Sequence, residues 1–296
     1  MKTQRIPNLK RGFTLMELMV AMAITTIIVT VLVSITSIAL ETWNRSRSEL
    51  RAARQAKAMV DTMARDFEAL VVRRGNESEW LSAVSSQPGT STSASELVFF
   101  TAATDRYEGN IGGADDKGGD VSCVGYVLNY KDPIGGGTSD NQTFVLNRYL
   151  VNPDEAFKNL LGQKDLAGKF MSNYGTLLSE EKYFVCENVF QFTIAFYVEV
   201  DAASASSGTS QVENRIVTIN PAGTTKKFSI KGTEIETTAT DPALSAGKIT
   251  AVEISLTVLS DAGVDLIRRT PSVAKKADFM AKNSYQYSKL VQLPGM

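Results

Sequence analysis

A long apolar stretch near the start of the chain is the strongest pattern in the sequence. From Phe13 to Leu40 the only charged side chain is that of Glu17, and the 23 residues between Glu17 and Glu41 are uncharged. At a rise of about 1.5 Å per residue, a helix of this length crosses a hydrocarbon core of about 30 Å. The leader, residues 1–12, carries four basic residues and no acidic one: Lys2, Arg5, Lys10 and Arg11. Such a leader stays in the cytoplasm, so we expect a single-pass segment at 13–40 with the bulk of the chain on the outer side.

Beyond Leu40 the helical pattern continues but becomes amphipathic. Apolar residues recur at intervals of three and four, the spacing of one helix face: Ala53, Ala56, Val60, Met63, Phe67 and Leu70. Charged residues fall on the other side: Arg51, Arg54, Asp61, Arg65 and Glu68. Gly75 and Asn76 are the first convincing stop signals. We expect one helix from Phe13 to about Arg73, whose amphipathic half, within 41–75, seats a globular head.

Residues 76–296 show short alternating runs typical of strands, separated by glycine- and serine-rich loops. Strands are expected at ELVFFTA from Glu96, at 123–130 and 143–151 as a hairpin, within 183–200, and at RIVTI, KFSIKG and KITAVEISLTVLS. Loops are expected at 82–95, 105–120 and 203–210, a helical or irregular segment at 154–182, and a polar tail from Pro271. The predicted fold class is α+β, with a long N-terminal α-helical spine packed on a strand-rich antiparallel head.

The composition narrows the possible functions. The sequence contains no histidine, the commonest general base and zinc ligand, and its formal net charge of -1 gives no general basis for nucleic-acid binding. No cofactor motif is present, so we expect no enzyme activity, no cofactor and no metal site. The glycine- and acid-rich stretch 105–120 has calcium-type ligands, but its spacing differs from an EF-hand loop, which favours a surface loop.

The two cysteines, Cys123 and Cys186, leave two interpretations open. Two thiols cannot supply a four-ligand zinc site alone. Outside the cytoplasm they could form one disulfide. Two buried free thiols are the alternative.

Residues Lys10 to Ile24, KRGFTLMELMVAMAI, resemble the type IV prepilin signature: a basic leader, a glycine, a hydrophobic residue and a glutamate four positions later. A secretory signal peptide would explain Ala21-Met22-Ala23, but the apolar run continues for 17 residues beyond Ala23. A plain signal anchor gives Glu17 no purpose, although a charge inside a membrane costs at least about 2.5 kcal/mol. The resemblance implies cleavage by a prepilin peptidase between Gly12 and Phe13, methylation of the Phe13 amine, and pairing of Glu17 with that amine on a neighbouring subunit. Pairing of Glu17 with the amine of its own subunit is the alternative.

Two polar patterns on the helix remain ambiguous. Small hydroxyl residues on one face can pack helices closely or bond their own preceding carbonyls: Thr26, Thr30 and Ser34. A basic cluster could contact lipid headgroups or DNA phosphates: Arg45, Arg47, Arg51 and Arg54. Because Glu41 and Glu49 interleave with that cluster, a solvated or subunit-contacting face is favoured.

The order of elements in the head also resembles the J-type minor pseudopilin of type II secretion and the W-type minor pilin. The shared points are MARDF near the end of the helix, ELVFFT, the GYVLNY–LNRYL hairpin, NVFQFTIAFY and KITAVEISLTVL. The resemblance implies a pilin-like fold and a minor subunit in the inner membrane, with a periplasmic head, later built into a filament. Its partners would be the prepilin peptidase, other pilin or pseudopilin subunits and an assembly platform. The alternative function is a pilin-anchored tip adhesin or DNA-uptake module, although nucleic-acid binding is disfavoured by charge.

Overall fold

The computed structural model describes residues 14–73, 75, 77–91, 93–103, 119–133, 141–203, 210–221, 223 and 225–293. The chain divides between Ser48 and Glu49 into two compact units. The first contains the N-terminal part of helix α1 (Leu15–Glu68), and the second contains the rest of α1 and all strands. We refer to residues 49–296 as the head unit.

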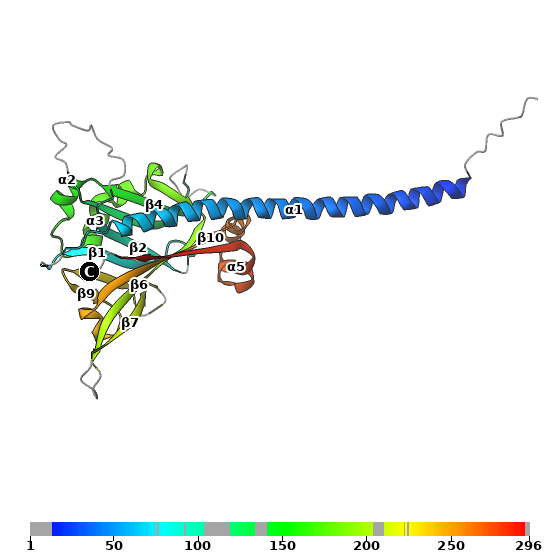
Figure 1. The fold of residues 1–296 in the computed structure, drawn as a ribbon. Helices are drawn as coiled ribbons and strands as arrows, with labels where there is room; N and C mark the ends of the chain where they lie inside the picture. Colours follow the sequence, from blue (N-terminus) through cyan, green and yellow to red (C-terminus); the bar gives the residue numbers. More distant parts are fainter. Residues whose placement is uncertain are drawn as a thin grey trace, which may run out of the picture. The chain divides into compact units, whose positions relative to one another are not determined.

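Within the head unit, α1 buries one face against the sheets (Figure 1). Its buried residues are Ala52, Ala56, Met59, Val60, Met63, Ala64, Asp66 and Phe67. This face confirms most of the expected apolar stripe, while Arg51, Arg54 and Arg65 are exposed as predicted. The Phe67 ring stacks on Phe99 at a centroid distance of 4.4 Å, which fixes the helix on the sheet.

The helix ends at Glu68, earlier than the predicted Arg73. Leu70 forms a β-bridge with Thr101, and the Val71 amide donates to the Phe100 carbonyl at 3.0 Å. The strand that contains Phe100 and Thr101 therefore pairs with backbone groups that would otherwise form hydrogen bonds within a longer helix. The stop is set by this tertiary pairing and not by the downstream Gly75.

The strands form two sheets in which all pairs are antiparallel. Sheet A has the order β5-β4-β3-β2-β1-β8-β9. Its strands are β1 (Glu79–Ser86), β2 (Ala94–Thr101), β3 (Ser122–Lys131), β4 (Thr143–Val151), β5 (Phe184–Glu187), β8 (Lys227–Lys231) and β9 (Glu234–Thr237). Sheet B has the order β11-β10-β6-β7. Its strands are β6 (Val189–Ala203), β7 (Ser210–Thr218), β10 (Lys248–Leu259) and β11 (Ser284–Gln292).

Aromatic side chains join the two sheets. Phe196 of β6 stacks on Phe228 of β8 with ring centroids 4.2 Å apart. Phe144 of β4 meets Phe190 of β6 edge-on at 5.3 Å. All four rings are at most 1% exposed, so they form a continuous core between the sheets.

The other face of sheet A is covered by a helical segment. It contains α2 (Pro153–Glu155), the π-helical turn η1 (Ala156–Leu160), α3 (Leu166–Leu178) and η2 (Glu181–Tyr183). Phe99 faces α1, so its strand neighbour Val98 and the cross-strand partner Gly125 point the other way. The Phe170 ring of α3 lies directly over Gly125, where a Cβ atom would collide with it.

A second helical segment joins β10 to β11, and one short turn precedes β10. The joining segment, which we call the C-terminal helical module, comprises α4 (Asp261–Arg269), η4 (Pro271–Lys275) and α5 (Ala277–Asn283). The turn before β10 is η3 (Pro242–Ala246).

The chain passes from sheet A to sheet B at Asn188, which has a φ of 61°. Its side chain accepts a hydrogen bond from the Thr143 hydroxyl at 2.7 Å and donates to Asp261 at 2.9 Å. These bonds hold a backbone conformation that asparagine tolerates better than most residues.

The predicted fold class is confirmed, together with the hairpin β3–β4 and the strands at β2, β5, β6, β7, β8 and β10. The expected loop at 82–95 is wrong at both ends, since residues 79–86 form β1, which lies between β2 and β8, and residues 94–101 form β2. The polar tail from Pro271, to which no element was assigned, contains α5 and β11. Strand β9 and helix α4 were not predicted. Most of the loop at 105–120 lies outside the described residues.

Candidate functional site

Glu17 lies in the first turn of α1, where it forms a capping box with Thr14. The Glu17 carboxylate accepts hydrogen bonds from the Thr14 amide at 2.9 Å and the Thr14 hydroxyl at 3.0 Å. The Glu17 amide donates back to the Thr14 hydroxyl at 3.3 Å. This exchange satisfies donors that a helix start otherwise leaves unpaired. The T-x-x-E spacing is visible in the sequence and signals this role, which the sequence analysis missed.

Residues 18–40 of α1, which follow this first turn, carry no charge and are exposed within the first unit. Among the described residues, α1 is the one helix long and apolar enough to cross a membrane, a test that signal sequences also pass. The hydroxyls of Thr26, Thr30 and Ser34 donate to the carbonyls four residues earlier at 2.8–2.9 Å. These three hydroxyls therefore bond the carbonyls of their own helix.

Gly12 and Phe13 lie outside the described residues, so the candidate site consists of Glu17, its cap and the apolar helix. Within the described part of the chain, no group of three or more carboxylate or thiol side chains is arranged to hold a metal ion.

A buried ion pair joins α1 to sheet A in the head unit. Asp66 is 2% exposed and receives two hydrogen bonds from Arg148 of β4, at 2.8 Å from Nε and 2.9 Å from Nη2. The Tyr126 hydroxyl also donates to Asp66. Burial, followed by the neighbouring Asp66 charge, raises the pKa of Tyr126 well above its ordinary value, so the phenol stays protonated and donates. Together these groups lock the helix over the β3–β4 hairpin.

A second polar contact holds α1 close to the start of the head unit. Arg51 pairs with Glu187 at the end of β5 and lies 3.6 Å from Asp261, the first residue of α4. Gln55 also donates to Glu187 at 3.1 Å. Arg51 of the basic cluster therefore contacts carboxylates of its own head, a partner that the sequence did not predict.

The cysteines are both free and fully buried, so a disulfide is not formed. Cys123 pairs with Val151 and Cys186 pairs with Leu146, five residues apart on the intervening strand β4. At about 3.3 Å per residue this offset is about 17 Å, whereas bonded cysteines have Cα atoms about 4.4–6.8 Å apart. Of the two interpretations left open above, the structure has the second, in which both thiols are free and buried.

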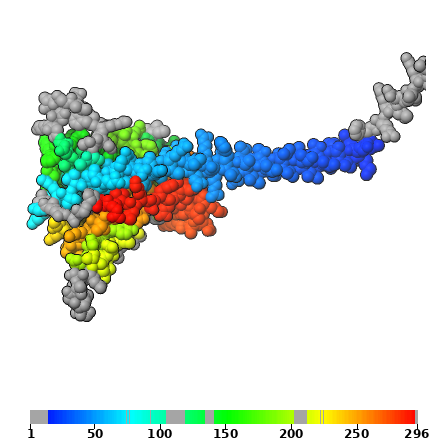
Figure 2. All heavy atoms as spheres, viewed as in Figure 1, coloured from blue at the N-terminus to red at the C-terminus, as the bar shows by residue number. Residues whose placement is uncertain are grey.

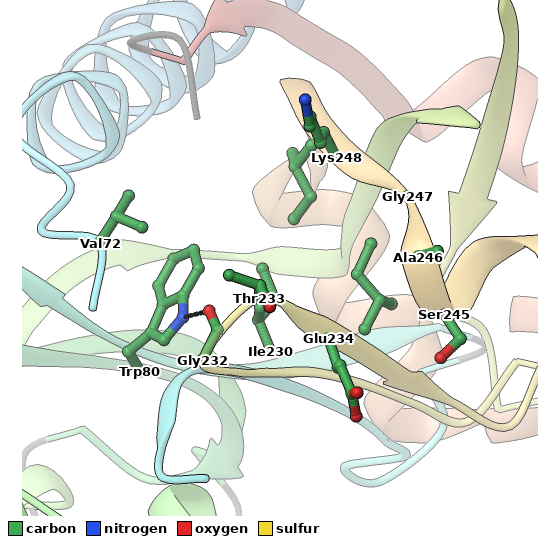
Figure 3. Close-up of a pocket in the computed structure, with 12 residues that line it drawn as sticks. Val72, Trp80, Ile230, Gly232, Thr233, Glu234, Ser245, Ala246, Gly247 and Lys248 are labelled. Carbon is green, nitrogen blue, oxygen red and sulfur yellow. Dashed lines mark hydrogen bonds between the residues drawn. The ribbon is translucent and has the colours of Figure 1, made fainter. Parts of the chain in front are cut away.

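A cavity of about 380 Å³ opens between the β8–β9 turn and the start of β10 (Figure 3). Trp80, Ile230, Ile235 and Ile249 provide its apolar wall. The Trp80 indole donates to the Gly232 carbonyl at 2.9 Å, which holds the ring in place. In Figure 3 the charged side chains of Glu234 and Lys248 extend in opposite directions and do not converge on one point.

Comparison with known proteins identifies the N-terminal segment. Residues 7–33 match the family model described as the prokaryotic N-terminal methylation motif. No curated protein sequence matched the chain. Among solved structures, the chain is similar to a type IV-like pilin from Thermus thermophilus at 12% identity and a TM-score of 0.33. The similarity covers 82% of this chain and 97% of that one.

The matched motif lies at the start of the long apolar helix, and an antiparallel, strand-rich head follows it. These features make the chain a type IV pilin-like protein. The N-terminal helix with its methylation motif is consistent with anchoring in a membrane.

Proposed function

We propose that the protein is a minor pilin or minor pseudopilin, a subunit of a type IV pilus-like or type II secretion filament. The observation that carries the proposal is the methylation motif at residues 7–33 on a helix whose apolar part contains a single charge, Glu17. In this proposal a prepilin peptidase cuts between Gly12 and Phe13 and methylates the new amine of Phe13. The subunit then leaves the inner membrane by joining the filament through α1, while its head stays on the periplasmic side.

Glu17 has a specific task in this proposal. Its carboxylate neutralises the N-terminal amine of Phe13 on the adjacent subunit, in a medium where opposite charges attract more strongly than in water. A lone carboxylate in a membrane is costly, and the hydrogen bonds from Thr14 reduce that cost before assembly. Thr14 would be the second residue of the processed chain, so cleavage leaves the capping residues intact.

The head supports a minor role and not a filament-building one. It contains two sheets of seven and four strands, which is more than a small, densely repeated subunit would carry. The proposed partners are other pilin or pseudopilin subunits, the peptidase and the assembly platform.

The charge can be tested separately from the helix cap. Glu17→Gln keeps an oxygen that can accept from Thr14, because glutamine also serves in a capping box, but it removes the negative charge. We expect this variant to enter filaments at least about ten-fold less often than the unmodified chain. A ten-fold loss corresponds to about 1.4 kcal/mol of lost stabilisation of the assembled state. The measurement is the ratio of sheared filament to membrane-retained protein by immunoblotting.

Thr14→Ala is the matched control. It removes the hydroxyl partner of Glu17 but keeps the carboxylate and the Thr14 backbone donor. We expect incorporation close to that of the unmodified chain. Equal incorporation of Glu17→Gln and the unmodified chain would show that the charge has no assembly role.

Processing is tested with Gly12→Val, which replaces the glycine before the proposed cut with a branched side chain and should leave the leader attached. Mass spectrometry of the N-terminal peptide should find an unmethylated chain that begins upstream of Phe13. A normally cut and methylated Phe13 in this variant would contradict the cleavage proposal.

A further inference from the structure

The C-terminal helical module carries an excess of exposed positive charge. Four cations on this segment are exposed: Arg269, Lys275, Lys276 and Lys282. Leu266, also on α4, is 42% exposed and adds an apolar side chain to the same module. In Figure 2 the module forms an orange-red surface of the head unit. We call these four cations and Leu266 the basic module surface.

The nearby acidic groups are mostly occupied by other partners. Asp261 binds Asn188 and lies near Arg51, and Asp265 pairs with Arg268 at 2.9 Å. Arg268 is further held by two hydrogen bonds to the Gln142 carbonyl. Asp278 is the remaining acidic residue of the module. Within the described residues, no hydrogen bond or ion pair joins the four cations of the basic module surface to another side chain.

The module lies at the end of the head unit where α1 enters it. Arg51, two residues after the start of this unit, contacts Asp261 at the beginning of α4. At the far end of α1, Leu70 pairs with Thr101 in sheet A. The basic module surface therefore belongs to the part of the head that contacts Arg51, and Arg51 is near the residue at which the head unit begins after the apolar run.

The chain between the apolar run and the head is short. From Glu41 to Glu49 the helix rises about 12 Å, so the head cannot begin farther than this from the end of the apolar run. The polar region of a bilayer is about 5–8 Å thick on each side, and charge interactions extend about 8–10 Å in physiological salt. Arg45 and Arg47, both exposed, add positive charge to the same stretch.

We propose that the basic module surface docks the head onto anionic phospholipid headgroups while the subunit waits in the membrane before assembly. This inference rests on the membrane anchoring within the proposed function. Lipid is favoured over an acidic protein because the chain length keeps the head close to the bilayer whenever α1 is inserted. Docking would limit the orientations of the head, and release from lipid would accompany extraction into a filament.

The expected strength follows from the number of cations. Each basic residue near an anionic surface strengthens attachment by about five-fold. Removing two of the four should therefore lower the ratio of docked to undocked heads by about 25-fold.

The test uses the full chain in lipid nanodiscs. A fluorophore is attached at Ser272→Cys, an exposed position in η4, and energy transfer is measured to headgroups that carry a short-range acceptor, so that transfer reports contact with the lipid surface and not the general proximity that α1 imposes. Labelling is selective because Cys123 and Cys186 are buried. We expect high transfer in nanodiscs containing phosphatidylglycerol and low transfer in pure phosphatidylcholine, and a fall to the low value in 1 M salt.

The decisive variant is Lys275→Gln/Lys276→Gln, with Lys158→Gln/Lys169→Gln as a control of equal charge change. Lys158 and Lys169 are exposed on the covering segment of sheet A, away from the C-terminal helical module. The first pair should reduce transfer on anionic nanodiscs to near the phosphatidylcholine level, and the control pair should not.

Three results would overturn the inference. Transfer that is independent of lipid charge would show that the surface does not bind lipid and would point to an acidic protein partner. An equal loss in both variants would show that only net charge matters. Failure of the chain to co-elute with nanodiscs would instead refute the membrane anchoring itself.

Discussion

At the scale of single residues, Asp66 shows how a charge can occupy an otherwise apolar face. It is the only charged residue among those buried on α1, and it lies between Met63 and Phe67 on the same side of the helix. The side chains of Asp66 and Arg148 are only 2% and 11% exposed, so both have lost most of their hydration. Their hydrogen bonds to each other and to neighbouring groups must offset that loss. The bidentate contact with Arg148 and the donor from Tyr126 provide that match.

We expect Asp66→Asn to destabilise the head unit by about 3–5 kcal/mol, because it leaves Arg148 buried without its counterion. Urea unfolding followed by near-ultraviolet circular dichroism measures this loss. Glu68→Gln, an exposed change two residues away, should stay within about 0.5 kcal/mol of the unmodified protein. Similar losses in both variants would mean that the ion pair contributes nothing specific.

The cysteines give a second prediction at this scale. Burial raises the pKa of Cys186 to about 12 and that of Cys123 well above its ordinary value. Since the thiolate is the reactive form, only about one Cys186 thiol in ten thousand is ionised at pH 8. Ellman's reagent should therefore label neither cysteine in the native chain and both after denaturation. If neither cysteine reacts after denaturation in the absence of reductant, the two cysteines form a disulfide.

Single-residue roles were only partly predictable from the sequence. Glu17 stood out because a charge inside an apolar run needs a reason, and the T-x-x-E spacing could also have revealed its cap. Asp66 was detectable as a charge within the stripe, but its partners Tyr126 and Arg148 are 60 and 82 residues away. No local pattern specifies contacts at such separations.

At the scale of elements, the packing of α3 on sheet A depends on one missing side chain. The Phe170 ring occupies the space above Gly125, and Phe170 also contacts Tyr149 at a ring distance of 6.4 Å. The strand must therefore present a glycine at this position for α3 to lie close to the sheet.

We expect Gly125→Ala to destabilise the head by about 1–3 kcal/mol, because the new methyl group overpacks against the Phe170 ring. Adding Phe170→Leu should recover part of the loss, which a double-mutant cycle by urea unfolding would measure. Losses that simply add would show that the alanine acts through the strand backbone and not through α3.

Element boundaries failed where tertiary pairing overrode local signals. Strand β1 contains Ser82, Ser85 and Ser86, which read as loop residues, yet β2 and β8 flank it on both sides. The helix ends at Glu68 because residues 69–71 pair with β2. Strongly alternating segments such as β10 were predicted correctly because their own residues carry the pattern.

At the scale of the whole molecule, the sequence allowed the α+β class and the helix-plus-head division to be predicted, but not the two-sheet arrangement. The chain leaves sheet A after β5, makes β6 and β7 of sheet B, returns for β8 and β9, and leaves again for β10 and β11. Strand composition indicates that strands exist and not which neighbours they select.

We expect a fragment of residues 49–296 to fold without the first 48 residues, because that unit holds the whole core. Its urea transitions by tryptophan fluorescence and far-ultraviolet circular dichroism should coincide, since the ring contacts Phe196–Phe228 and Phe144–Phe190 pack the two sheets into one core. Separate transitions would show that the sheets unfold independently.

The contact between Lys289 of β11 and Asp61 of α1, at 2.8 Å, spans 228 residues. A chain that crosses a membrane from its N-terminal side presents α1 long before β11 has been synthesised. During that interval the side of α1 that carries Asp61 lacks its β11 partner, and β10 lacks β11 once it has been made. Such late closure slows folding and leaves an intermediate with exposed apolar surface, which gives a chaperone a defined period in which to bind.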